Sequence, residues 1–263
     1  MPKTLETVIE LTHRVTSGLS LVLVIGLALA TLRVHARPHP ARSAALAAII
    51  FIVLEALVGA AIVLLRLVGS DSSVSRAVIM AVHLINTCLL TFALLLAART
   101  SGQSPPRRFD WRAPRAGRAW LGALLLLAVS AAGAVTALGD TLFPLDAQAR
   151  VAEQTMSASA HFLERTRGFH PVFAALSAGF LLWAAPSLGS PSNGNVHGRR
   201  KLASQGWVQA LVCLQIGLGL LNVWLSAPGW MQIVHLGAAN VLWLAWSWLL
   251  LETSEVHPER EVR

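Results

Sequence analysis

The chain lacks tyrosine, and charge is scarce: Asp, Glu, Lys and Arg make up 13% of its 263 residues. Soluble domains carry about 25% charged residues, so an ordinary soluble domain is excluded. Cysteine is scarce as well. Cys88 and Cys213 both fall in apolar segments, which argues against an exposed disulfide and predicts that both are packing residues.

Long apolar runs replace the missing charge: 55% of the residues are hydrophobic, and the mean hydropathy is +0.61. A helix of about 20 apolar residues crosses a bilayer core about 30 Å thick. Seven segments have this length, which predicts an integral membrane protein without a soluble domain. They cover residues 15–34, 44–65, 77–98, 119–139, 168–186, 204–226 and 232–251. The first lacks the small-residue cleavage site of a signal peptide.

The basic residues alternate between loops. Fourteen of the 21 Lys and Arg residues lie in the connections 33–42, 99–118 and 187–203 and in the tail after residue 251. Basic loops stay in the cytoplasm. This predicts a multi-pass protein of the inner (plasma) membrane, with the N-terminus as given outside and the C-terminus cytoplasmic. The net charge of +8 is therefore a topology signal, with the lipid bilayer and not nucleic acid as the partner.

The chain contains an internal repeat. The same order of polar residues occurs twice in apolar surroundings: His13, Glu55 and His83, then His170, Gln215 and His235. The spacings are 42 and 28 residues in the first series, and 45 and 20 in the second. The first three predicted helices are therefore counterparts of the last three.

The helix at 119–139 has no counterpart. This predicts an all-α integral membrane protein of two pseudo-symmetric transmembrane four-helix bundles, with the first helix of the N-terminal bundle missing. The predicted units are an N-terminal three-helix bundle (1–98), a basic proline-rich cytoplasmic linker (99–118), a C-terminal four-helix bundle (119–251) and a cytoplasmic tail (252–263). By symmetry, we expect an eighth helix upstream of residue 1, which would place the true N-terminus in the cytoplasm.

Four histidines lie in or at the edge of the predicted spans: His13, His83, His170 and His235. An imidazole in a membrane helix is costly and marks function. Counted from the cytoplasmic helix ends at about 1.5 Å per residue, each pair agrees in depth to within about 2 to 6 Å, toward the outer face. Two histidines from facing helices can supply both axial ligands of a heme iron. Zinc is less favoured, because no further ligand is evident at the second pair.

The remaining histidines are expected to have no role in chemistry. His35, His39, His197 and His257 lie in basic loops or the tail, which predicts solvated surface positions. His161 lies just before a span, where capping or surface exposure is the expected role.

Charged residues accompany two of the histidines. Glu10 lies three residues before His13, so the two share a helix face, whereas Arg14 is expected to point elsewhere, toward headgroups or a heme propionate. Arg167 holds the equivalent place before His170. One half thus pairs its histidine with an acid and the other with a base, which suggests that one site does chemistry and the other holds a permanent cofactor. A capping acid and a snorkelling arginine are the alternative.

Three further polar residues lie within spans. For Glu55, a proton path, a substrate contact and a hydrogen-bonded structural role all stay open, since its counterpart Gln215 is neutral. Asn86 and Asn240 lie near the second histidine of each half and are expected to tie helices together.

Six segments carry a family resemblance: VIELTHRVTSG (8–18), EALVGAAIVL (55–64), SRAVIMAVHLINT (75–87), GAVTALGDTLFP (133–144), HFLERTRGFHPVFA (161–174) and QIVHLGAANVLW (232–243). In order and spacing, over essentially the whole chain, the sequence resembles the heme A synthases, which are eight-helix proteins of two pseudo-symmetric bundles. Members commonly begin with a helix and an outer loop that often carries a Cys pair, and this chain starts after both. An upstream start is therefore expected. Glutamine is common where this chain has Glu55.

The resemblance implies oxidation of the C8 methyl group of heme O to a formyl group, giving heme A for terminal oxidases. It implies that the N-terminal bundle holds substrate heme O, with ligands at His13 and His83 and an essential acid at Glu10. It also implies a resident heme b with ligands at His170 and His235. Glu10 would help to manage protons while heme b delivers electrons from an unknown donor. A heme O synthase is the expected partner, and Arg14 and Arg167 are candidate propionate contacts.

Two other functions stay open. A diheme b-type electron carrier also uses histidine pairs, but commonly has hemes on both sides of the membrane, whereas both pairs here lie outside. A heme-handling assembly factor would bind heme O or heme A without oxidising it.

Overall fold

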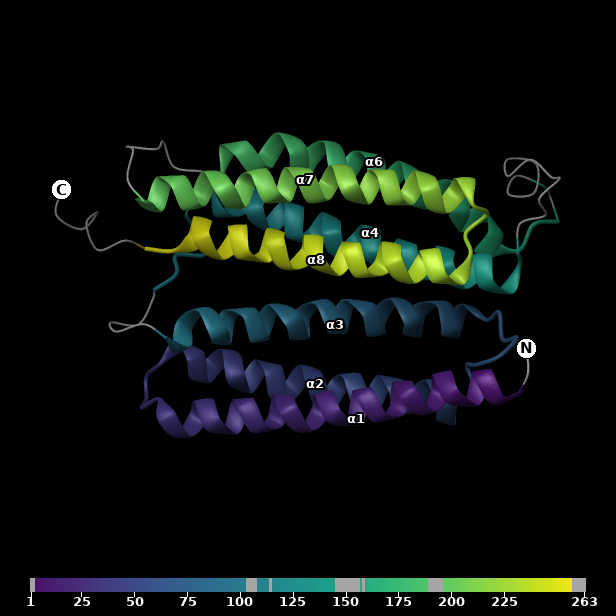
Figure 1. The fold of residues 1–263 in the computed structure, drawn as a ribbon, viewed down its shortest axis with the longest axis horizontal. Helices are drawn as coiled ribbons and strands as arrows, with labels where there is room; N and C mark the ends of the chain where they lie inside the picture. Colours follow the sequence, from purple (N-terminus) through teal and green to yellow (C-terminus); the bar gives the residue numbers. More distant parts are fainter. Residues whose placement is uncertain are drawn as a thin grey trace.

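The computed structural model describes residues 3–102, 108–113, 115–144, 157, 159–188 and 196–256. Seven helices in this part of the chain are long and apolar enough to cross a membrane, so the predicted all-α membrane fold is confirmed. They are α1 (Lys3–Val34), α2 (Pro40–Leu64), α3 (Val74–Ser101), α4 (Ala116–Leu142), α6 (Phe162–Ser187), α7 (Val196–Trp224) and α8 (Gly229–Ser254). The helices lie side by side, with successive helices running in opposite directions (Figure 1).

The helices extend beyond their predicted apolar cores. α1 begins at Lys3 and not near residue 15, and α6 begins at Phe162 and not at residue 168. His161 caps α6: its Nδ1 accepts a hydrogen bond from Leu163 N, while Glu164 accepts one from His161 N. This capping box fixes the start of the helix, and the expected capping role of His161 is confirmed.

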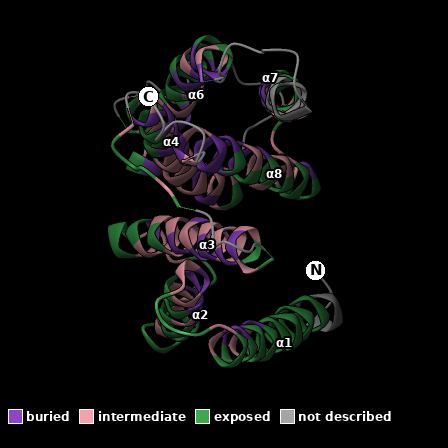
Figure 2. Ribbon diagram, turned by 90° about the vertical axis from the view of Figure 1, so that its left-hand side faces the viewer, coloured by how far each residue is buried: buried purple, intermediate pink, exposed green. Residues whose placement is uncertain are grey.

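The helices form two groups of different shape (Figure 2). In the C-terminal group, α4 packs on α6, α6 on α7, α7 on α8 and α8 on α4, which makes a closed ring. In the N-terminal group, α1 packs on α2 and α2 on α3, in an open row without a comparable α1–α3 interface among the described residues. α3 joins this row to the ring through α4 and α8. The predicted two-bundle plan is therefore present, with three helices in the N-terminal bundle.

The internal repeat is visible in the packing. Glu55 in α2 and Gln215 in α7 each lie nine residues before the last residue of their helix. Residues 51–60 and 211–220 also have the same order of buried, half-buried and exposed positions. α2 and α7 therefore hold equivalent places in the two groups.

Two tryptophans of α8 connect it to both groups. Trp246 is fully buried, and its Nε1 donates to Ala119 O of α4 at 2.8 Å. Trp243 Nε1 donates to Cys88 O of α3 at 2.8 Å. Gly122 of α4 lies against the Trp246 ring, where a Cβ would be 2.0 Å from Cζ2. α8 can approach α4 this closely because residue 122 has no side chain.

Many large apolar side chains of the helices are exposed, as expected of a surface covered by lipid. On α1, every side chain from Thr7 to Ser20 is exposed.

Cys88 is buried, as predicted, but Cys213 is exposed, so the prediction that Cys213 packs inside the protein is wrong. Both cysteines are free.

The contact between Gly122 and Trp246 gives a stability prediction. Gly122→Ala places a methyl group inside the Trp246 ring volume, and overpacking of this kind costs about 1–3 kcal/mol. The matched control is Gly179→Ala in α6, where nothing lies within 4 Å of the new Cβ. We expect thermal unfolding in detergent, followed by circular dichroism, to show a lower midpoint for Gly122→Ala only. Equal midpoints for the two variants would contradict the packing described here.

Candidate functional site

Four helices, α1, α3, α6 and α8, begin at the same end of the molecule (Figure 1). The sequence of each contains one histidine, near the start of the helix. His13, His83, His170 and His235 lie ten, nine, eight and six residues after the first residues of α1, α3, α6 and α8. At a rise of about 1.5 Å per residue, this spread is about 6 Å. The four imidazoles therefore lie at nearly one level along the helices.

The C-terminal pair lies in the closed ring. His170 lies on α6 and His235 on α8, two helices on opposite sides of the ring. The Nδ1 atom of each ring is buried and has no hydrogen-bond partner in the described structure. Glycines make room for both rings: a Cβ on Gly133 would lie 3.0 Å from His170 Cε1, and one on Gly219 would lie 3.3 Å from His235 Cε1. Two imidazoles from facing helices thus share the ring interior, which is the donor set of a bis-histidine heme site.

The N-terminal pair is arranged differently. His83 in α3 has a side chain that is 25% exposed, whereas His13 lies fully on the exposed face of α1. Like α6 and α8, α1 and α3 form no extensive interface with each other in the described part of the chain. A site shared by these two histidines stays a prediction.

Glu10 and Arg14 form an ion pair on α1. Arg14 Nη2 donates to Glu10 Oε1, and the two side chains are 64% (Arg14) and 61% (Glu10) exposed. The expectation that Arg14 points away from Glu10 is therefore wrong, because residues four apart lie on the same helix face. The pair lies beside His13 in sequence, and the chemical roles assigned to Glu10 and Arg14 stay predictions.

Glu55 and Gln215 each contact the second histidine of their half. Glu55 Oε1 lies 3.4 Å from His83 Nδ1. Gln215 Nε2 lies 3.2 Å from His235 Nε2 and 3.2 Å from His235 O. The repeat therefore places a carboxylate beside one imidazole and a neutral amide beside the other.

The two asparagines differ in their contacts. Asn86 Nδ2 donates to Phe51 O at 2.9 Å and to Glu55 Oε2, so it ties α3 to α2, as expected. Asn240 Nδ2 donates to Leu236 O of its own helix at 2.9 Å. The expectation that Asn240 ties two helices together is therefore wrong.

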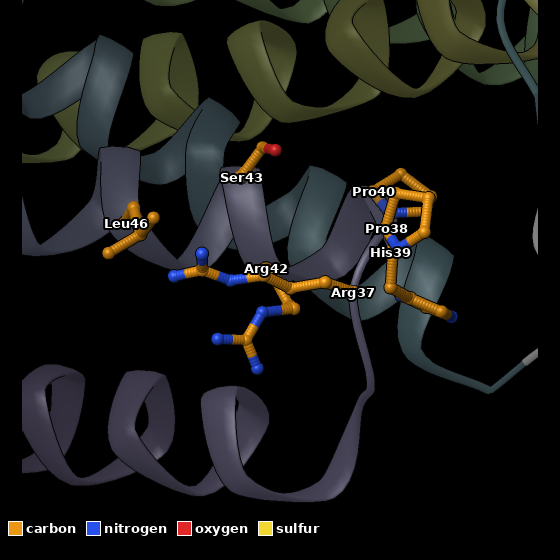
Figure 3. A pocket seen from close by; sticks show the side chains of 7 residues that line it. All are labelled: Arg37, Pro38, His39, Pro40, Arg42, Ser43 and Leu46. Carbon is orange, nitrogen blue, oxygen red and sulfur yellow. The ribbon is translucent and has the colours of Figure 1, made fainter.

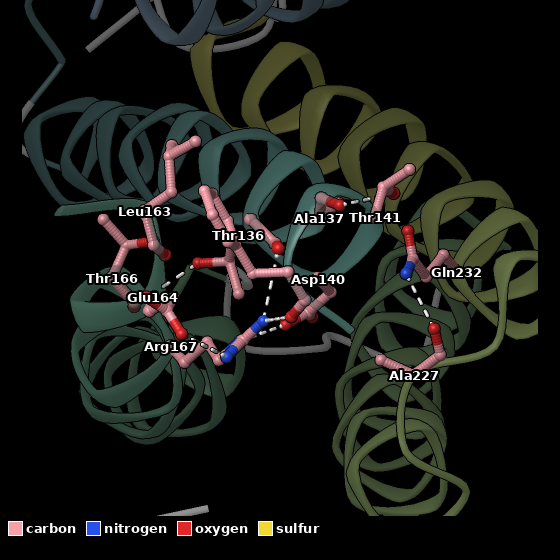
Figure 4. Close-up of polar contacts among 12 residues, drawn as sticks. Thr136, Ala137, Asp140, Thr141, Leu163, Glu164, Thr166, Arg167, Ala227 and Gln232 are labelled. Carbon is pink, nitrogen blue, oxygen red and sulfur yellow. Dashed lines mark hydrogen bonds and ion pairs between the residues drawn. The ribbon is translucent and has the colours of Figure 1, made fainter. Parts of the chain in front are cut away.

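Arg167 is buried at the histidine end of the C-terminal ring (Figure 4). Its Nε donates to Asp140 Oδ1 of α4 at 2.5 Å, and its Nη2 donates to Gly139 O at 3.2 Å and to Phe143 O. Its Nη1 lies 4.0 Å from Glu164 Oε1. The guanidinium thus clamps the ends of α4 and α6 together, and its contact with a propionate stays a prediction.

Sequence reasoning missed Asp140. This residue lies just past the predicted end of the helix at 119–139, where an acidic residue indicates only that the membrane span has ended. A buried arginine needs a paired anion. Asp140 lies at the same end of the neighbouring helix as Arg167, and that position could have identified the pair.

A hollow of about 470 Å³ lies at the other end of the molecule, between α1 and α2 (Figure 3). Arg37, His39 and Arg42 contribute to its lining. Arg42 donates to His35 O at 2.7 Å and to Leu32 O, which ties the end of α1 to the start of α2. The hollow is therefore separate from the level of the four histidines.

His35 and His39 interact near this hollow. Their ring centroids are 4.2 Å apart, and burial together with the nearby His35 ring lowers the pKa of His39. His39 Nδ1 caps α2 by accepting from Ala41 N at 3.2 Å, and His35 Nε2 contacts Ser101 O at 3.0 Å. The sequence predicts solvated surface positions for both histidines, and this prediction is wrong because each has partners within the protein. His197 and His257 lie outside the residues whose side chains are described.

The fold and the histidines define a class, a multi-pass helical membrane protein with paired imidazoles inside a bundle. Comparison with protein families then identifies the member of this class. The profile of COX15-CtaA, described as cytochrome oxidase assembly protein, matches residues 3–247. The chain belongs to this family, which is the heme A synthase family.

Two curated relatives, from two strains of Thermus thermophilus, are named protoheme IX farnesyltransferase. Each is 38% identical to this chain over 253 residues, which are 95% of this chain and 40% of the relative. The chain therefore spans less than half the length of these relatives.

The clamp between α4 and α6 can be tested by stability measurements. Asp140→Asn removes the nearest anion of the buried Arg167 cation and leaves only Glu164, 4.0 Å away, among the described ion pairs; breaking a buried pair costs about 3–5 kcal/mol. We expect the free energy of unfolding in detergent to fall by about this amount. Thr141→Val is the control, because Thr141 is exposed and bonds within its own helix; we expect a change within about 0.5 kcal/mol. A cost for Asp140→Asn no larger than that of the control would refute the clamp.

Proposed function

We propose that the protein is a heme A synthase, an oxidoreductase that converts the C8 methyl group of heme O to the formyl group of heme A. The observation that carries this proposal is the set of four histidines at one level, two in each half, in a member of the cytochrome oxidase assembly protein family. A methyl group becomes a formyl group by two hydroxylations and loss of water. The reaction therefore needs a proton-handling group and a source of electrons near the methyl group.

The C-terminal pair is the proposed site of a resident heme b. His170 and His235 would hold the iron from α6 and α8, and the contacts of their rings with Gly133 and Gly219 support the fit. The two buried Nδ1 atoms without partners mark polar groups that a ligand can satisfy. Heme b bound there would supply one-electron transfer. The closed ring around the pair suits a cofactor that stays bound.

The N-terminal pair is the proposed site of substrate heme O. His13 and His83 are the proposed iron ligands, one on the exposed α1 and one on α3, where the helix row meets the ring. The residue three positions before the first histidine is the exposed acid Glu10 in this half, whereas in the other half it is the buried base Arg167, paired with Asp140. This difference supports the assignment of substrate to one half and permanent cofactor to the other.

Glu10 is the proposed catalytic acid. Its carboxylate lies one turn before His13 and is exposed on α1, so it is accessible to a substrate bound beside that helix. Arg14 holds the Glu10 carboxylate in place through Oε1 and is the proposed contact for a propionate of heme O. In this assignment, Glu10 accepts and returns a proton at the carboxylate during the successive hydroxylations.

A heme O synthase is the proposed partner. Relatives that contain a segment similar to this chain are named protoheme IX farnesyltransferase, which supports a link with the supply of heme O. We also propose that the histidine end of the molecule faces the outside of the plasma membrane, because the arginine-rich loops lie at the opposite helix ends. With both pairs at one level, the molecule is poorly suited to carry electrons across the bilayer between two hemes.

Heme analysis tests the activity. The chain is expressed beside a heme O synthase, and the extracted hemes are separated by chromatography. We expect heme A or its hydroxylated precursor with the wild type, and at least a hundredfold less product with Glu10→Gln, since acid–base groups contribute about 10²–10⁴-fold. Incorporation of heme b without any oxidised heme O would instead indicate a heme-handling assembly factor.

Spectra of the purified protein test the ligands. His170→Ala and His235→Ala should each abolish the low-spin spectrum of the resident heme, because a bis-histidine iron loses an axial ligand. His39→Asn is the control: asparagine preserves the cap of α2, and His39 lies at the opposite end, so the spectrum should not change. If the low-spin spectrum survives in both alanine variants, this pair does not hold the heme.

A further inference from the structure

Glu55 is a carboxylate in the middle of a membrane helix, and its side chain is 20% exposed. Intramembrane acids are costly and need partners. Three side chains of α3 surround it. Thr87 Oγ1 donates to Glu55 Oε1, Asn86 Nδ2 donates to Oε2, and His83 Nδ1 lies 3.4 Å from Oε1. One residue of α2 is thus held by three polar groups from consecutive turns of α3.

The geometry selects one nitrogen of His83. The Nδ1 atom of His83 is buried and faces Glu55 Oε1. The two atoms are close, but no well-aligned hydrogen bond to Nδ1 occurs in the described structure. Asn86 and Thr87 occupy both carboxylate oxygens and so fix the position of Oε1 beside the ring. A proton on Nδ1 is therefore favoured, since the atom facing it is an acceptor. Nε2, on the other side of the ring, is left as the nitrogen for a metal.

The other half lacks this arrangement. Gln215 takes the place of Glu55, and it contacts His235 through the opposite ring nitrogen, Nε2. Counted from the second histidine, Ala238 and Ala239 stand where Asn86 and Thr87 stand, and the nearby Asn240 donates to a carbonyl of its own helix. The two halves thus differ in charge and in the ring nitrogen that is contacted.

We propose that Glu55 is a positioning residue that orients His83 and increases its donor strength toward an iron bound at Nε2. This inference rests on the proposed function, because it takes His83 as the ligand of substrate heme. A carboxylate beside the second nitrogen of a ligating imidazole fixes the tautomer and raises its basicity. The stronger donor and the adjacent negative charge stabilise ferric over ferrous iron. An iron bound at His83 would therefore have a lower reduction potential with Glu55 beside the imidazole than with a neutral amide in that place.

Redox titration of the loaded protein tests this role. Glu55→Gln keeps the shape and one acceptor oxygen, replaces the other acceptor with an NH2 donor and removes the charge, and it copies the residue of the other half. We expect the heme that depends on His83 to lose about tenfold in its preference for the ferric state, which raises its midpoint potential by about 59 mV. The heme that depends on His170 should keep its potential. Glu55→Ala should in addition weaken retention of heme at His83 by roughly 10- to 100-fold.

Three further variants make the result specific. Gln215→Glu should lower the potential of the C-terminal heme and leave the N-terminal heme unchanged. Thr91→Val is the control on α3, since Thr91 bonds only to carbonyls of its own helix, and it should shift neither heme. His83→Ala identifies which spectrum belongs to the N-terminal site. In every variant except Gln215→Glu, an unchanged spectrum of the C-terminal heme also shows that the C-terminal ring is folded.

The outcomes separate this inference from the function on which it rests. If His83→Ala removes one heme but Glu55→Gln shifts its potential no more than Thr91→Val does, the positioning role is overturned while the ligand assignment stands. If His83→Ala removes no heme, the proposed substrate site is wrong and the role of Glu55 falls with it. A shift of both hemes by Glu55→Gln would show a general disturbance and would also overturn the proposal.

Discussion

The packing of α8 against both α3 and α4 is the interaction on which the rest of the arrangement depends. Hydrophobic burial drives little association between helices in a bilayer, so close packing and interhelical hydrogen bonds must do so. Trp246 and Trp243 supply both, because each buries a large ring and donates to a backbone carbonyl of a different neighbour. Contact with α4 closes the ring, and contact with α3 attaches the open row. The histidines of α8 and α3 thereby come to one level.

The two halves of the repeat contain equivalent positions in different surroundings, because only the helices of the C-terminal group form a closed ring. In the ring, Arg167 lies three residues before His170 and finds its anion on α4, so the charge is buried and locked between two helices. On α1, Glu10 holds the same place before His13, and its counter-ion is Arg14 of the same helix. A charge satisfied across two helices stabilises the bundle, whereas a charge satisfied locally on an exposed face remains available to a bound molecule. Different packing thus gives equivalent positions different partners, across two helices in one half and within one helix in the other.

Much of the fold could be predicted from sequence, because hydrophobic length and charge alternation act locally. The count of seven spans, the pairing of halves and the capping by His161 all depend on short segments. Interactions between segments were harder to predict. Arg14 was expected to turn away from Glu10, although their spacing of four residues allowed a pair. Asp140 was missed because its partner is 27 residues away. Asn240 was given the role of Asn86 although it lies five residues after its histidine and Asn86 lies three after its own, so the two residues are at different positions on their helices.

The contrast between Glu55 and Gln215 shows how one substitution can differentiate two repeated sites. Both residues lie nine positions from the end of their helix and contact the second histidine of their half. Only Glu55 has donors from α3 on both oxygens, and these offset the cost of a carboxylate in a medium of low dielectric. The same donors prevent the carboxylate from turning away from His83. The charge is therefore tolerated at this position by the contacts that direct it toward the imidazole, and an amide at position 215 needs no such support.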